Sequence, residues 1–127
     1  MEQAFYDNIE RHTRENTDFR RVLFTGKGSQ LVLMCLEAND ALGMETHPEN
    51  DQFFRFESGV GKAIVAGKEY AICDGMTVIV PMGTEHNIVN TSATEPLKFY
   101  TIYSPAHHPD GTVHRTKKEA DEAEAHA

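Results

Sequence analysis

Two short segments of the chain carry side chains that could bind a metal ion together. The first contains Glu45 and His47, separated by one residue, and Gln52 follows soon after; His86 lies in the second. If the first segment is a strand, Glu45 and His47 point to the same face, because strand side chains alternate. A carboxylate and an imidazole are costly to bury in an apolar interior without a partner. We therefore predict that Glu45, His47, Gln52 and His86 bind one divalent metal ion.

The residues after Gln52 extend the candidate site into the core. On a strand, Gln52, Phe54 and Phe56 share one face. A buried amide beside two phenylalanines needs a polar partner. Gln52 is therefore expected either to bind the metal through its oxygen or to orient a ligand by donating a hydrogen bond. Phe54, Phe56 and Ile88 are expected in the core, and they are also candidates to line a substrate pocket.

The elements that must position these side chains are short strands. From residue 19 onward, segments rich in Val, Ile, Phe, Tyr, Leu and Thr alternate with breaks containing Gly, Pro, Asn or Asp. No connection is long enough for a crossover helix, so we expect antiparallel pairing in a sandwich or barrel. The predicted strands are Phe19–Phe24, Gln30–Glu37, Met44–His47, Gln52–Glu57, Gly61–Val65, Glu69–Cys73, Thr77–Val80, His86–Asn90 and Leu97–Tyr103.

A length of 127 residues favours one compact domain. We predict a charged N-terminal lead-in over 1–18, a β-barrel over 19–104 and a polar C-terminal tail over 105–127. The last part of the tail, rich in Lys, Glu and Ala, is expected to be a solvated helix or a frayed segment. Its remaining histidines are expected in a surface or interface loop rather than in a second metal site. They are His107, His108 and His114.

The segment from Gly75 to Asn90 resembles the second sequence motif of the cupin superfamily. It fits the pattern G(x)5PxG(x)2H(x)3N at every specified position, with His86 as the histidine. The first cupin motif, G(x)5HxH(x)3–4E(x)6G, is met in altered form. Glu45 stands in place of its first histidine, His47 matches the second, and Gln52 replaces the glutamate. The resemblance implies an all-β double-stranded β-helix, or jelly-roll, barrel with short helical or irregular terminal extensions.

The altered first motif changes the expected ligand chemistry. The usual cupin ligand set has three imidazoles and one carboxylate, whereas this chain would offer two imidazoles, one carboxylate and one amide. The formal ligand charge is unchanged, and the additional oxygen donor favours Zn, Mn, Fe or Ni over Cu(I). Position 39 is Asn where the motif begins with Gly, although Gly59 falls at the specified distance.

The chain is also similar to small single-domain cupins described as mannose-6-phosphate isomerase-like. That resemblance implies a homodimer that binds a small-molecule ligand. The apolar segments Phe19–Phe24 and Gln30–Glu37 are the candidates to supply the dimer contact.

Composition excludes several other classes of function. The net charge of −8 gives the chain no electrostatic reason to bind nucleic acid or an anionic membrane surface. No apolar run approaches the length of a membrane helix. The N-terminal sequence does not resemble a secretory signal, so we expect a cytoplasmic protein. Cys35 and Cys73 lie in apolar runs and are expected to be buried thiols.

Two classes of function remain open, and no catalytic residue can be assigned. As an enzyme, the protein would hold an oxygen-rich substrate, such as a sugar or an organic acid, on a metal with open coordination positions. Zinc or manganese points to isomerisation or lyase chemistry, and iron with dioxygen points to a dioxygenase. The only evident candidates for a base are Tyr100 and Tyr103, which disfavours the isomerase. The alternative is a non-catalytic module whose metal helps to bind a small anion or sugar, or only braces the barrel.

Overall fold

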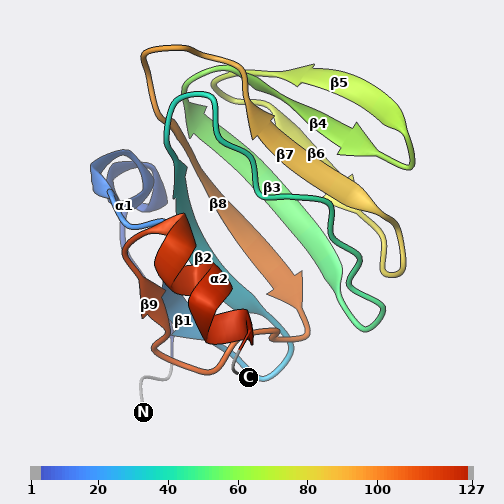
Figure 1. Cartoon of the computed structure of the whole chain (residues 1–127). Helices are drawn as coiled ribbons and strands as arrows, with labels where there is room; N and C mark the ends of the chain where they lie inside the picture. Colours follow the sequence, from blue (N-terminus) through green and yellow to red (C-terminus); the bar gives the residue numbers. More distant parts are fainter. Residues whose placement is uncertain (1–3, 126–127) are drawn as a thin grey trace.

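Two antiparallel sheets face each other in this computed structural model, which describes residues 4–125 (Figure 1). The order of the six-stranded sheet is β6 (Thr77–Val80), β3 (Asp51–Ser58), β8 (Leu97–Ser104), β2 (Gln30–Leu36), β1 (Arg20–Thr25) and β9 (Val113–His114). The order of the three-stranded sheet is β5 (Lys68–Ile72), β4 (Gly61–Val65) and β7 (His86–Asn90). The antiparallel all-β architecture predicted from the strand pattern is confirmed.

The apolar core lies between the two sheets. Phe54 and Phe56 of β3, Phe99 of β8 and Ile88 of β7 are fully buried there. Burial alternates along the whole of β8, as expected for a strand with one face on the core. The predicted assignment of Phe54, Phe56 and Ile88 to the core is therefore confirmed. No helix in the described part of the chain has the length and apolarity needed to cross a membrane.

One predicted strand, Met44–His47, is wrong. Glu45 forms a single isolated bridge with His86, and no ladder extends on either side of it. The segment is bounded by Gly43, whose φ is +97°, and by Pro48, which has no N–H to donate. These two residues leave too few extended positions for a strand, so the chain crosses beside β7 as an irregular segment (Figure 1).

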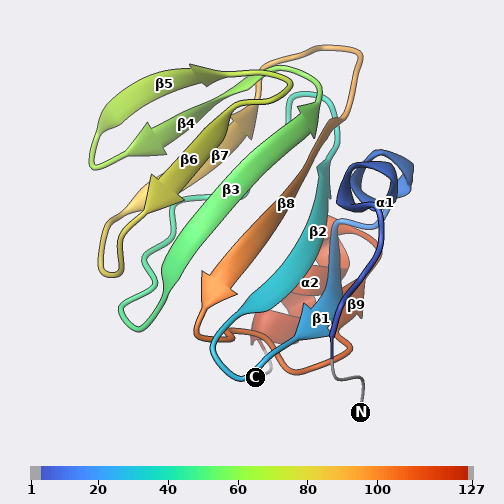
Figure 2. The ribbon, with the colours of Figure 1, turned by 180° about the vertical axis from the view of Figure 1, so that it is seen from behind.

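The terminal segments pack on opposite faces of the six-stranded sheet. Helix α1 (Ile9–Glu15) is capped by Asn8, whose side chain accepts a hydrogen bond from the Arg11 backbone N–H, and it contacts β2, β3 and β8. Helix α2 (Lys117–Ala125) lies over β1 and β2 on the other face (Figures 1 and 2). Ala120 of α2 is almost completely buried and belongs to the core. The predicted tail thus contains a packed helix rather than only a solvated one.

Strand β2 has no free edge for a dimer contact. Its two edges pair with β1 and β8 along its length. All residues of β2 except Leu31 are buried within the described chain. The homodimer therefore stays a prediction. Of the two segments proposed to mediate it, Phe19–Phe24 and Gln30–Glu37, the second is already paired on both edges within the protomer.

The two cysteines differ in exposure. Cys35 is buried in β2 as predicted, but Cys73 is exposed, and that prediction was wrong. Cys73 follows β5, which is an edge strand with four exposed residues, and it precedes the turn at Asp74. The apolar run that suggested burial thus belongs to a strand that is largely exposed to solvent.

Gly61 lies where β4 approaches β7 too closely for a side chain. A Cβ atom at this position would collide with the carbonyl oxygen of Val89 and lie 3.1 Å from Cδ2 of Leu97. We expect Gly61→Ala to lower the free energy of unfolding by about 1–3 kcal/mol, the usual cost of overpacking. Urea denaturation measures this change. Gly28→Ala is the matched control, because no described residue other than its two chain neighbours lies within 4 Å of the added atom. Equal stability of the two variants would contradict the close packing of β4 on β7.

Candidate metal centre

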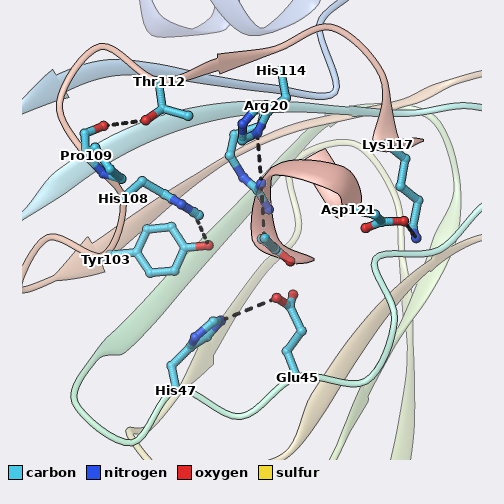
Figure 3. Close-up of polar contacts among 11 residues, drawn as sticks. Arg20, Glu45, His47, Tyr103, His108, Pro109, Thr112, His114, Lys117 and Asp121 are labelled. Carbon is cyan, nitrogen blue, oxygen red and sulfur yellow. Dashed lines mark hydrogen bonds and ion pairs between the residues drawn. The ribbon is translucent and has the colours of Figure 1, made fainter. Parts of the chain in front are cut away.

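The structure brings together three of the four predicted metal ligands. One donor atom from each of Glu45, His47 and His86 lies within 4.8 Å of the others. Glu45 Oε2 and His47 Nε2 are 3.9 Å apart and point toward each other (Figure 3). His47 and His86 are buried, whereas the Glu45 side chain is 28% exposed. The cluster therefore has a buried side and a side open to solvent.

Backbone hydrogen bonds place Glu45 opposite His86. The Glu45 N–H donates to the His86 carbonyl at 2.8 Å, and the His86 N–H donates back at 2.9 Å. Residues that exchange both bonds in an antiparallel bridge project side chains to the same face. His86 begins β7 directly after the corner at Gly83, whose φ is +81°, a conformation that favours glycine. One bridge at the end of a strand thus aligns two ligands that are distant in sequence.

Gln52 faces His86 in a way that favours a shared cation. His86 Nδ1 lies 2.9 Å from the Thr84 carbonyl oxygen, which can only accept, so Nδ1 carries the proton. In the neutral ring, His86 Nε2 then presents a lone pair to Gln52 Oε1, 3.1 Å away. The Gln52 amide nitrogen donates to Thr101 Oγ1 at 3.0 Å. Two donor atoms that bind one metal at right angles, each about 2.1 Å from it, lie about 3 Å apart. Gln52 is therefore placed to act as a fourth ligand.

His47 adds a nitrogen atom without a hydrogen-bond partner to the site. Its Nε2 atom is buried and has no hydrogen-bond partner among the described residues. Burial, followed by the charges of His107, His86 and Arg20, lowers the pKa of His47 to about 4. Burial also lowers the pKa of His86. Both imidazoles are thus neutral at pH 7, which is the form that binds metal.

The donor set fits a divalent transition metal. Two neutral imidazoles, one carboxylate and an amide oxygen converge, and a buried nitrogen without a partner is explained by a cation beside it. Burial raises the pKa of Glu45 to about 7, and a bound cation would favour its charged form. When bound, such a metal would act as a Lewis acid on an oxygen atom of a ligand.

A cavity of about 520 Å³ opens at the exposed side of this cluster. Helix α2 and the segment between β8 and β9 supply its outer wall, so parts of the predicted tail enclose the site. The lining residues are Glu45, Thr46, His47, His107, His108, Pro109, Thr112, His114, Ala123 and Glu124. His107 and His108 lie in the surface segment between β8 and β9, and His114 lies in β9. All three line the cavity, and sequence reasoning did not connect them with the site.

The side chain of Gln30 holds two of these histidines in place. Its Oε1 accepts hydrogen bonds from the backbone N–H groups of His107 and His108, at 3.1 and 2.9 Å, and its Nε2 donates to the His108 carbonyl at 2.7 Å. The His107 ring then lies 4.4 Å from the His47 ring, measured between centroids. Gln30 is only 1% exposed, and these hydrogen bonds explain why a polar side chain is buried in β2.

The other predicted site residues lie around this cavity or behind it. Phe54 packs behind His86, with ring centroids 6.0 Å apart. Phe54, Phe56 and Ile88 are not among the lining residues of the cavity, so their role in substrate binding stays a prediction. Of the two tyrosines, Tyr103 is buried and lies 5.5 Å from the His47 ring, whereas Tyr100 is half-buried beside Phe53.

Comparison with known proteins agrees with this fold. YrkC of Bacillus subtilis strain 168 is 45% identical over 129 residues, covering 96% of this chain and 68% of that protein. L612 of Acanthamoeba polyphaga mimivirus is 40% identical over 114 residues, covering 87% of this chain and 71% of that protein. The crystal structure of BH2720 from Bacillus halodurans is 40% identical, with a TM-score of 0.92 and coverage of 94% and 95%.

The family assignment comes from a match to a domain model. A family model described as a cupin domain matches residues 32–103, which include all four predicted metal ligands. The mannose-6-phosphate isomerase-like subgroup stays a prediction. The match covers more than half of the chain, and the two-sheet fold and the second cupin motif agree with it. This protein therefore belongs to the cupin family.

Proposed function

We propose that this protein is an enzyme that binds one divalent transition metal and acts on a small oxygen-rich molecule, a sugar or an organic acid. The metal would be held by Glu45, His47 and His86, with Gln52 as the fourth ligand. The observation that carries the proposal is the convergence of these donors at the wall of a cavity of about 520 Å³. A site of two histidines and one carboxylate with open positions is typical of catalytic metals.

The position of the cluster argues against a metal that only braces the barrel. A structural site is usually closed by protein ligands on all sides. Here His86 and Gln52 close the inner side, while Glu45 and His47 line the cavity. A small molecule in the cavity could therefore approach the metal directly.

Groups able to transfer a proton surround the cavity, and this favours the enzyme over a purely binding module. His107 lies against His47, and His108 Nε2 is 3.4 Å from the Tyr103 hydroxyl. Burial is the main cause that lowers the pKa of His107, so its ring is neutral at pH 7 and can accept a proton. The sequence offered only two tyrosines as a base, which disfavoured an isomerase. His107 is now a specific candidate for that base.

The ligand set restricts the metal without naming it. Nitrogen and oxygen donors suit Zn, Mn, Fe and Ni, and the choice among them selects the chemistry. Iron would favour the dioxygenase alternative, because two histidines and one carboxylate are the ligands of non-haem iron oxygenases. Zinc or manganese would favour isomerisation or lyase chemistry.

The experiment that tests the proposal starts with metal analysis of protein purified without a histidine tag. Inductively coupled plasma mass spectrometry is expected to find about one transition metal per chain. The cobalt(II)-substituted protein is then mixed with sugars and hydroxy acids. We expect its visible spectrum to change with at least one ligand, and proton NMR to show conversion of that ligand by the native metal form.

Each outcome separates the proposal from its alternatives. Absence of metal, even after reconstitution, would contradict the metal centre. A metal whose cobalt spectrum no ligand changes would support a bracing role, and a spectral change without conversion would support the non-catalytic binding module.

A further inference from the structure

A buried arginine lies beside the cavity, outside the predicted metal site. Arg20 is the first residue of β1 and is 4% exposed. Its Nη1 lies 3.2 Å from His114 Nδ1 (Figure 3) and 3.4 Å from Glu124 Oε1. Its buried Nε has no hydrogen-bond partner among residues 4–125. His114 and Glu124 both line the cavity. They therefore stand between the guanidinium group and the space next to the metal site.

The contacts of Arg20 leave its charge poorly compensated. A buried guanidinium group has five N–H donors and is costly unless it is paired and hydrogen-bonded. Its one carboxylate contact among the described residues is long and uses a single nitrogen, and the Glu124 side chain is 58% exposed. A carboxylate that pairs closely with guanidinium usually accepts two parallel hydrogen bonds. Arg20 can thus bind another carboxylate that lies closer than Glu124 and accepts two of its hydrogen bonds.

The charge of Arg20 lies next to the cavity. Among the described residues, Arg20 is the only Arg or Lys whose side chain is buried. Its two polar contacts, His114 and Glu124, both line the cavity. Apart from a bound metal, Arg20 therefore supplies a buried positive charge at this end of the cavity.

We infer that the cavity binds a small organic acid whose carboxylate replaces Glu124 on Arg20 while the metal holds other oxygen atoms of the same molecule. This inference rests on the proposed function and narrows its substrate from sugars or acids to acids. Glu124 lies near the end of α2 and occupies the position that the carboxylate of the ligand would take. A neutral sugar has no charge with which to displace it.

The test compares two probes that differ by one carboxylate. Malate and lactate both offer a hydroxy acid group to the metal, but only malate has a second carboxylate for Arg20. We expect isothermal titration of the zinc-loaded full chain to show malate binding at least about tenfold more tightly than lactate. In Arg20→Lys, which keeps the charge but loses the paired donors, this preference is expected to disappear.

Two substitutions on α2 test the displacement of Glu124. Glu124→Gln removes the competing carboxylate and is expected to tighten malate binding by roughly threefold or more without a matching effect on lactate. Glu122→Gln is the matched control, because its side chain is 63% exposed on the same helix, pairs with Lys118 and does not line the cavity. We expect it to bind both probes as the wild type does.

Several results would overturn the inference while leaving the metal centre intact. Equal binding of malate and lactate by the wild type is one, and an unchanged preference in folded, zinc-loaded Arg20→Lys is another. Binding of inorganic phosphate with rejection of malate would also overturn the assignment to a carboxylate. Failure of the zinc titration itself, measured first in the same samples, would instead contradict the proposed function.

Discussion

Alanine in place of His47 or His86 is expected to remove metal from the protein. The candidate ligand set has two histidine nitrogen atoms and two oxygen atoms, and each substitution deletes one of the nitrogen atoms. Loss of a supporting contact to a ligand typically costs 10–100-fold in affinity, so loss of the ligand itself should cost at least about 100-fold. Metal analysis after dialysis, followed by titration against a chromophoric chelator, measures the stoichiometry and the affinity.

Two other histidines provide controls for this result. His12 lies on α1 and pairs with Asp7, so His12→Ala is expected to keep its full metal content. His107→Ala removes a ring that lies next to His47 but is outside the cluster of convergent donors. Loss of metal in His107→Ala equal to that in His47→Ala would show that the ligand set is wrong. Circular dichroism of each variant confirms that the fold is kept.

The residues of the candidate metal centre could be picked out from the sequence because they lie in local patterns. The Gly83 corner and the strand after it fix His86 within one motif, and Gln52 lies at the start of β3, on the same face as Phe54 and Phe56. The prediction that Glu45 lies near His47 is confirmed, but the strand on which it was based does not form. A single backbone bridge to His86 positions Glu45 instead.

The cavity wall was not predictable from local patterns. His107 and His108 are held by the side chain of Gln30, which is more than 70 residues earlier in the chain. The sequence analysis did not single out Arg20, and only the packing of α2 and β9 shows that it is buried. Contacts of this kind depend on where the C-terminal segment returns, and no periodicity in the sequence encodes that path.

The asparagine at the end of the second cupin motif is buried because its side chain bonds to the backbone of other segments. Asn90 is 1% exposed, and its amide nitrogen donates to the carbonyl groups of Leu36, Glu37 and Glu95. These bonds tie the loop that leads toward Glu45 to the strand that begins at His86. The motif asparagine therefore supports the candidate metal centre through the backbone, without contacting the cluster itself.

The affinity for metal is expected to depend on pH through Glu45 rather than through the histidines. Burial raises the pKa of Glu45 to about 7, so a metal that binds below that pH must displace its proton. Burial lowers the pKa of His47 to about 4 and also lowers that of His86, so both rings lose their protons at a lower pH than Glu45 does. Affinity should therefore rise with pH up to about 7 and then level off.

In the wild type, one competing proton predicts a loss in metal affinity that approaches about tenfold per pH unit well below 7, or about 50-fold between pH 7 and pH 5. Calorimetry in two buffers with different ionisation enthalpies measures the protons released, and we expect about one at pH 6. Glu45→Gln keeps an oxygen donor but has no titrating group, so its weaker affinity should be nearly constant over the same range. Release of two protons at pH 6, or the same pH dependence in Glu45→Gln, would show that a histidine controls metal binding and that Glu45 does not.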